Sequence, residues 1–276
     1  MAKSKDTQNA TPPPVPAKSK GPKPFVKYYL IAYNVLSTLG WSYVLVVTLL
    51  HLFFPSATEP SSSFSRFIPA FLSWSKPKFK PLNNAFESQI PKFLLPAYYR
   101  TATTYAQVGE TTALVQSAAV LEILQVMLGF VRSPLPTTVM QVSSRLFLVW
   151  GVVAQYPSVR MNPLYTSMVF AWSLTEVIRY SFYAFSLTAP TYPPPKFLTY
   201  LRYTTFYVLY PLGASSEAFI NYASLPSSSP LEGKWSLYDY FRGVLFLIWW
   251  PGLYVMYTHM IKQRRKAFGG GKVKTN

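Results

Sequence analysis

Residues 28–54 read YYLIAYNVLSTLGWSYVLVVTLLHLFF, an apolar run that contains no aspartate, glutamate, lysine or arginine. A helix needs about 20 apolar residues to cross the hydrocarbon core of a bilayer. This run is long enough to cross as one helix, and Pro55 ends it because proline cannot continue the helical hydrogen-bond pattern. The stretch therefore predicts a membrane protein.

Five more apolar segments follow, and turn or charge signals separate them. Tryptophan and tyrosine gather at several segment ends, as in the aromatic belts of membrane proteins. The sequence predicts an all-α membrane protein, a bundle of six transmembrane helices. The five further helices are expected at residues 111–131, 137–156, 163–187, 197–225 and 237–261.

The formal net charge is +17, and the basic residues are concentrated in the two tails. Basic residues that flank apolar spans mark the cytosolic side of a membrane protein. Six spans place both termini on one side, so both termini are expected in the cytosol. No nucleic-acid partner is expected, because the charge does not form a basic patch on a folded domain. The tail residues are Lys3, Lys5, Lys18, Lys20, Lys23 and Lys27, then Lys262, Arg264, Arg265, Lys266, Lys272 and Lys274.

Composition divides the chain into three regions. Residues 1–27, rich in lysine, proline, serine and threonine, are predicted to be a disordered basic tail. The six-helix transmembrane domain is expected at residues 28–262, and a second basic tail at residues 263–276. Within the domain, residues 55–105 form a long first loop. This loop either lies on the membrane interface through its aromatic and lysine residues or contains a re-entrant segment.

Cysteine is absent, and the only two histidines, His51 and His259, lie in different apolar segments. Non-haem iron and zinc sites need clustered histidine, cysteine or carboxylate ligands. A histidine-rich desaturase or hydroxylase is therefore excluded, and no metal site is predicted. A cysteine-dependent phosphatase is excluded as well, because its nucleophile is missing.

Ionisable residues lie inside several predicted spans, where they are costly and suggest function. Glu122, Arg145, Glu176 and Arg179 fall in the second, third and fourth spans. Glu176, Arg179 and Tyr180 share one helix face by their spacing. They form either a structural ion pair that joins helices or part of a polar cavity, and the sequence leaves both readings open.

Tyr210 and Glu217 are a heptad apart in the fifth span, so they share a helix face. A carboxyl group at membrane depth is paired, protonated or used in proton transfer. A lone tyrosine at that depth is more often a packing or interface residue. Pro211 and Gly213, between the two, predict a distortion of the helix.

The chain resembles the very-long-chain 3-hydroxyacyl-CoA dehydratases, also called the protein-tyrosine-phosphatase-like family. The resemblance covers nearly all of the membrane region in family order, whereas the N-terminal tail and much of the first loop fall outside it. The matching segments are YNVLSTLGWSYVL (33–45), LVQSAAVLEILQVMLGFVRSPLPTTVMQVSSRLFLVWG (114–151), AWSLTEVIRYSFYAF (171–185), LRYTTFYVLYPLGASSE (201–217) and PGLYVMYTHMIKQRRK (251–266).

The resemblance implies dehydration of a 3-hydroxyacyl-CoA to the trans-2-enoyl-CoA, the third step of microsomal fatty-acid elongation. The family's catalytic tyrosine and glutamate correspond to Tyr210 in YPLG and Glu217 in SSE. One group must accept a proton and the other must donate one. We expect Glu217 to take the proton next to the thioester, and the opposite division stays open. No cofactor is expected.

Basic residues suit the phosphates of coenzyme A. Arg202, Arg132 and Lys196 are expected to meet these phosphates at the cytosolic mouth, although Arg202 and Lys196 could equally reach the interface as ordinary snorkelling residues. The other predicted substrate-binding residues are Arg179, Tyr180 and Arg145.

The resemblance also implies a multi-pass protein of the endoplasmic reticulum membrane that contacts the condensing enzyme and the reductases of the elongation cycle. Lys272 and Lys274 match a dilysine retrieval signal of that compartment. The alternative function is a non-enzymatic membrane scaffold or adaptor, in which Tyr210 and Glu217 would be dispensable. A transporter is disfavoured, because the chain shows no internal repeat.

Overall fold

The computed structural model describes residues 24–54, 89–189 and 191–269. Within these ranges the protein is all helical, without a β-strand, which confirms the predicted all-α class. Most of the predicted N-terminal tail, much of the first loop and the C-terminal lysine motif lie outside the described residues.

Each of the six predicted apolar segments coincides with helix. Helix α1 begins inside the predicted N-terminal tail, and the second segment begins at Thr104 rather than Thr111. The α-helices are α1 (Pro24–Phe53), α3 (Leu95–Thr101), α4 (Thr104–Ser117), α5 (Val120–Met127), α6 (Leu135–Leu146), α7 (Pro157–Arg160), α8 (Pro163–Thr188), α9 (Lys196–Arg202), α10 (Phe206–Ala223) and α11 (Leu237–Phe268). A π-helix, η4 (Phe147–Val153), continues α6, and a 3-10 turn, η5 (Pro230–Glu232), precedes α11.

The distortion predicted at Pro211 and Gly213 does not interrupt the helix. Helix α10 runs through both residues, and the chain instead leaves the helix at residues 203–205, between α9 and α10. Pro211 lies in the second turn of α10, where its missing N–H removes a single helical hydrogen bond. The catalytic candidates therefore stand on one continuous helix.

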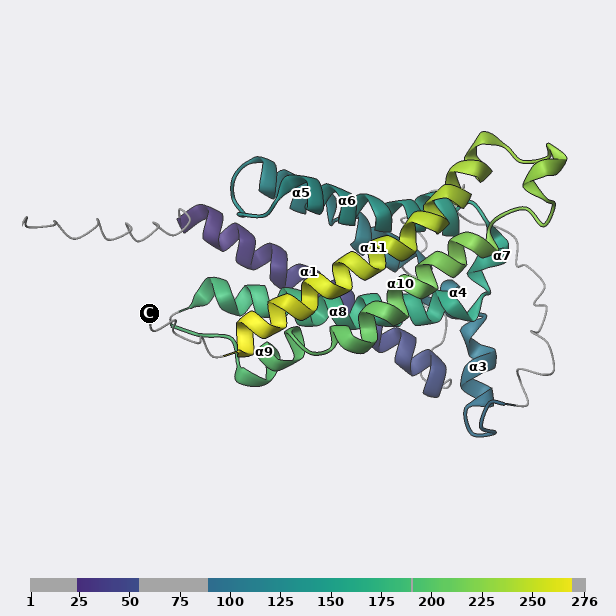
Figure 1. The fold of residues 1–276 in the computed structure, drawn as a ribbon. Coiled ribbons are helices and arrows are strands. Elements are labelled where there is room, and N and C mark those ends of the chain that lie inside the picture. Colours follow the sequence, from purple (N-terminus) through teal and green to yellow (C-terminus); the bar gives the residue numbers. More distant parts are fainter. Residues whose placement is uncertain (1–23, 55–88, 190, 270–276) are drawn as a thin grey trace, which may run out of the picture.

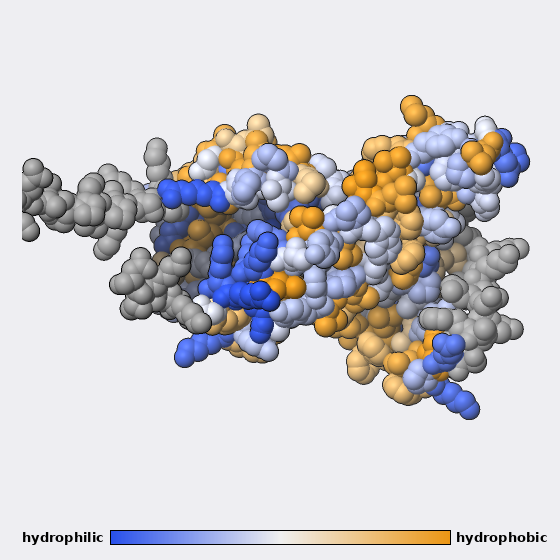
Figure 2. Space-filling view, viewed as in Figure 1, coloured by the Kyte–Doolittle hydropathy of each residue, from blue (hydrophilic) through white to orange (hydrophobic). Residues whose placement is uncertain are grey.

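Helices α1 and α11 are long and apolar enough to cross a membrane. The other apolar segments are divided into shorter helices or, in α8, carry Glu176 and Arg179. Many apolar side chains are exposed; along α11, for example, Leu247 and Val255 are more than half exposed. Such a surface is unusual for a protein surrounded by water. Figure 2 shows hydrophobic patches on both flanks of the face in view, with hydrophilic residues near the C-terminal end of α11.

Helix α8 is the central element of the bundle. It packs between α1 and α10, while α4 lies on α1 and α11 lies on α10 (Figure 1). Its buried residues include Tyr165, Met168 and Trp172, which join Trp41 of α1 and Leu148 of η4 in one hydrophobic core. Residues on α8 can therefore contact catalytic candidates on either side.

The connections between the long helices gather at two ends of the bundle (Figure 1). One end holds the start of α1, the α5–α6 turn, helix α9 and the end of α11; the other holds α3, α7 and the α10–α11 connection. The described start and end of the chain thus lie at the same end, as six antiparallel segments require.

A buried arginine joins α11 to α10 at the second of these ends. Arg242 is fully buried, forms an ion pair with Asp239, and donates a hydrogen bond of 2.6 Å to the carbonyl oxygen of Ser224. Its own carbonyl accepts a 2.8 Å hydrogen bond from the side chain of Asn221. Arg242 therefore satisfies the C-terminal end of α10, where helical carbonyls lack partners.

Replacing Arg242 with methionine should lower the free energy of unfolding by about 3 kcal/mol, because Asp239 and the Ser224 carbonyl would lose their partner. Thermal unfolding of the purified protein in detergent measures this change. The same replacement at the exposed Arg265 of α11 is the control and should leave the unfolding midpoint nearly unchanged. Equal midpoints for both variants would contradict a stabilising role for Arg242.

Candidate active site

Tyr210 and Glu217 lie two turns apart on one face of α10. The indole N–H of Trp172, on α8, donates a hydrogen bond of 2.6 Å to Oε1 of Glu217. Trp249 of α11 also interacts with the Glu217 carboxyl group. Tyr210 lies close enough to Glu217 for an electrostatic interaction. Three helices thus fix the carboxyl group in position.

Gly213 allows α10 to approach α8 closely at this point. A Cβ atom at Gly213 would lie 3.4 Å from Cβ of Ala171 and 4.0 Å from Oε1 of Glu217. A larger side chain there would separate the helices or cover the carboxyl group. The glycine between the two candidates is therefore explained by close packing.

Arg145 of α6 places a positive charge beside the pair. Its guanidinium carbon lies 5.1 Å from the centre of the Trp172 ring, a cation–π distance. The same group forms an ion pair with Glu176 and interacts electrostatically with Glu217 and Tyr210. The structure thus brings together three predicted site residues, Tyr210, Glu217 and Arg145, which come from two helices.

A chain of ion pairs continues from Arg145 away from α10. Glu176 pairs with Arg179 at 2.6 Å, and Arg179 donates two hydrogen bonds, of 2.8 and 3.1 Å, to the two carboxyl oxygens of Glu122. The Tyr180 hydroxyl donates a 2.5 Å hydrogen bond to Glu122, and the Tyr33 hydroxyl lies 3.4 Å from the same oxygen. This ion-pair network connects α1, α5, α6 and α8.

The spacing of Glu176 and Arg179 left open whether the two residues form an ion pair. They do, and this pair is part of the larger ion-pair network. The charges of Arg145 and Arg179 balance those of Glu122 and Glu176. Glu217 is a further carboxyl group that shares Arg145 with Glu176. Three carboxyl groups thus share two guanidinium groups, and Arg145 is the one that interacts with both Glu176 and Glu217.

The remaining predicted binding residues lie elsewhere. Arg202, at the end of α9, donates a 3.2 Å hydrogen bond to the Tyr183 hydroxyl. Lys196 begins α9, and Arg132 lies exposed in the α5–α6 turn. These two elements belong to the bundle end that holds both described chain ends (Figure 1). Arg179 and Tyr180 are engaged with Glu122 in the ion-pair network.

Trp172, Trp249 and Tyr33 are site residues that the sequence did not reveal as such. Trp172 precedes Glu176 by one helical turn, so its place on the polar face of α8 was available from the spacing. No local pattern links Trp249 or Tyr33 to the site, because both reach it from other helices. Among the described residues, no group of three or more histidine, aspartate or glutamate side chains could hold a metal ion.

Replacing Glu176 with glutamine should lower the free energy of unfolding by about 3 kcal/mol or more, because Arg145 and Arg179 would face each other without their shared carboxylate. Thermal unfolding in detergent measures the loss. The matched control is Glu232→Gln, which breaks the exposed pair with Lys234 and should cost less than about 1 kcal/mol. If Glu176→Gln unfolds no earlier than the control, the network does not stabilise the bundle.

Comparison with known proteins identifies the family. The family model described as protein tyrosine phosphatase-like protein, PTPLA, matches residues 116–270. A protein of Schizosaccharomyces pombe named probable very-long-chain (3R)-3-hydroxyacyl-CoA dehydratase is 45% identical over 167 residues, which cover 60% of this chain and 77% of the relative.

Two animal relatives extend the similarity along most of the chain. A very-long-chain (3R)-3-hydroxyacyl-CoA dehydratase of Caenorhabditis elegans is 36% identical over 259 residues, 90% of this chain and 98% of the relative. Very-long-chain (3R)-3-hydroxyacyl-CoA dehydratase 2 of Mus musculus is 32% identical over 260 residues, 91% of this chain and 84% of the relative. No solved structure matches. The chain belongs to the protein tyrosine phosphatase-like (PTPLA) family, together with these relatives.

Proposed function

We propose that this protein dehydrates very-long-chain 3-hydroxyacyl-CoA to trans-2-enoyl-CoA, the third step of microsomal fatty-acid elongation. The names of the relatives support this reaction. The similarity to the two animal relatives extends over almost the whole chain. The observation that carries the proposal for this site is the juxtaposition of Tyr210, Glu217 and Arg145, all three partly buried in the bundle. A proton donor, a proton acceptor and a compensating charge are thereby held together.

The reaction needs two proton transfers. Glu217 accepts a proton from the carbon next to the thioester, and the carbon–hydrogen electron pair becomes the new double bond. The hydroxyl group on the neighbouring carbon leaves as water after it receives a proton from Tyr210. Return of the proton from Glu217 to Tyr210 restores the starting state. The reverse division, with Tyr210 as the base and Glu217 as the acid, balances equally well.

Positioning of Glu217 supplies much of the catalysis in this proposal. The hydrogen bond from Trp172 fixes one oxygen of the Glu217 carboxyl group, and the charge of Arg145 helps to orient that group. A base fixed beside its substrate avoids the entropy loss of bringing the two together in each turnover. Fixed donors and charges also need no rearrangement when charge develops in the transition state.

The proposed setting is the endoplasmic reticulum membrane, crossed by six helical segments with both termini cytosolic. Three observations support a membrane setting with both termini on one side: two helices of spanning length, exposed apolar side chains, and the common position of both described chain ends. Basic residues concentrate toward that end of α11, as expected for a cytosolic face. The acyl chain of the substrate and the bilayer would then share one apolar environment.

The direct test is to incubate the purified protein with a 3-hydroxyacyl-CoA and follow the enoyl thioester by ultraviolet absorption. Tyr210→Phe and Glu217→Gln should each lower kcat by about a hundredfold or more, the usual contribution of general acid–base catalysis. Tyr222→Phe, on the exposed side of α10, is the control and should retain activity. Product formation at the normal rate by Tyr210→Phe would exclude the proposed pair, whereas no product with the wild-type protein would favour the scaffold alternative.

Arg202 tests the proposed position of coenzyme A. Arg202→Gln should raise KM for 3-hydroxyacyl-CoA by about tenfold, because a charge-assisted hydrogen bond to a phosphate would be lost. The matched substrate is the acyl-pantetheine thioester, which lacks the nucleotide phosphates; for this substrate the replacement should change KM little. A similar rise in KM for both thioesters would show that Arg202 acts on the fold of α9 and not on phosphate.

A further inference from the structure

A cavity of about 260 Å³ lies between α4, η4 and α8, and the proposed proton transfers do not use it. Its walls are mainly apolar and include Ala113 of α4, Val149 and Val153 of η4, and Met168 of α8. The wall formed by η4 is a π-helix, a rare conformation that occurs frequently at functional sites. Glu110, exposed on α4, also borders the cavity, and the apolar part of the lining fits a hydrocarbon.

The cavity adjoins the candidate active site through two helices. Val149 follows Arg145 by about one turn, and Met168 precedes Trp172 by about one turn. Arg145 lies over the ring of Trp172, and Trp172 donates its hydrogen bond to Glu217. On both helices, the Arg145–Trp172 contact beside the proposed base therefore lies about one turn from the cavity lining.

The parts of the site follow one another along the bundle. Arg202 belongs to the end that holds both described chain ends, Tyr210 and Glu217 lie farther along α10, and the cavity lies near the N-terminal part of α8, at the opposite end (Figure 1). From Trp172 to Tyr165, at the far wall, the helix rises by about 10 Å. An acyl-CoA has its phosphates, its thioester and its hydrocarbon tail bonded in this same order.

We propose that the cavity between α4, η4 and α8 receives the distal hydrocarbon of the acyl chain and so limits the chain lengths that the enzyme accepts. The proposal rests on the proposed dehydratase function. Small residues keep the space open: Ala113 borders it on α4 and Ala154 borders it after η4. At Gly109 the ring of Tyr105 lies where a Cβ atom would stand, so glycine allows this ring to fold against α4.

The side of the cavity that faces outward is bridged by one hydrogen bond. The indole N–H of Trp150, on η4, donates a 3.0 Å hydrogen bond to Oγ of Ser117, on α4. Trp150 and Leu114, which also line the cavity, remain partly exposed at 40% and 55%. The cavity is thus partly exposed to the surroundings of the bundle on this side.

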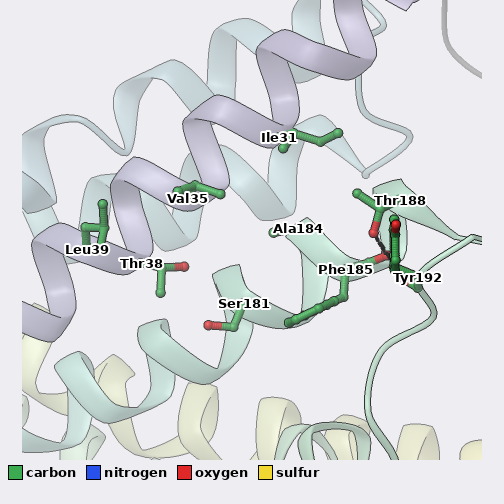
Figure 3. Close-up of a pocket in the computed structure, with 9 residues that line it drawn as sticks. All are labelled: Ile31, Val35, Thr38, Leu39, Ser181, Ala184, Phe185, Thr188 and Tyr192. Atoms are coloured by element: carbon green, nitrogen blue, oxygen red, sulfur yellow. Dashed lines mark hydrogen bonds between the residues drawn. The ribbon is translucent and has the colours of Figure 1, made fainter.

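A larger groove, of about 340 Å³, lies between α1 and α8 and is the competing location for the tail (Figure 3). Figure 3 shows Val35 and Leu39 of α1 opposite Ser181 and Phe185 of α8. At 3.6 residues per turn, Ser181 lies on the side of α8 opposite Trp172. This groove is therefore not in line with Glu217.

Ala113→Leu tests the assignment by filling the cavity. The ratio of kcat/KM for a very-long-chain to that for a medium-chain 3-hydroxyacyl-CoA should fall by at least about tenfold, because extra methylene groups in a filled space cause steric strain. The control is Ala106→Leu, an exposed position on the same helix outside the cavity, which should keep the wild-type ratio. If Ala113→Leu does not fold, Ala154→Leu fills the cavity from another wall and gives the same measurement.

A second measurement locates the tail directly. A 3-hydroxyacyl-CoA with a diazirine at the chain end should crosslink to residues of α4, η4 and the first half of α8. An unchanged ratio in both filled variants, or crosslinks at Val35 and Phe185 instead, would overturn the assignment. Wild-type protein that dehydrates no acyl-CoA of any length would instead refute the proposed function itself, so the two failures are distinguishable.

Discussion

The structure depends on the pairing of charges inside an apolar bundle. Arg145, Glu176, Arg179 and Glu122 form an uninterrupted chain of ion pairs across three helices. In an apolar surrounding an unpaired charge costs several kcal/mol, whereas a paired and hydrogen-bonded charge is tolerated. The pairing therefore specifies which faces of α5, α6 and α8 meet, and the hydroxyl of Tyr33 adds α1 to the same cluster. Apolar packing alone would specify those faces less strictly.

The same network determines what Glu217 can do. Because Glu176, which also pairs with Arg179, holds Arg145 at one side, the Arg145 guanidinium stays over Trp172 and within reach of Glu217. Trp172 and Arg145 then constrain the carboxyl group from two helices. A general base is effective when such neighbours orient it. The ion-pair network and the catalytic candidates are thus parts of one polar interior.

Local sequence patterns predicted the helical segments and the residues that share a helix face, but they did not predict the contacts between helices. The apolar runs indicated all six helical segments, and spacing placed Glu176 with Arg179 and Tyr210 with Glu217 because both relations hold within one helix. The contacts of Glu122 with Arg179 and of Trp172 with Glu217 join residues far apart in sequence, so no periodicity reveals them. No local pattern predicted the break between α9 and α10 at residues 203–205. Pro211 predicted a distortion, and α10 continues through this residue. Helix propensity describes single residues, and packing on α8 overrides it.

A hydrocarbon tail gains little by moving from lipid into an apolar cavity, since both surround it with similar groups. The cavity between α4, η4 and α8 would therefore add little affinity, and its dimensions would act mainly by exclusion. A chain that fits leaves the thioester beside Glu217, whereas a chain that is too long displaces the thioester or must leave the bundle. Selection of chain length would then act through the placement of the reacting carbon beside Glu217, the proposed base, which Trp172 and Arg145 orient.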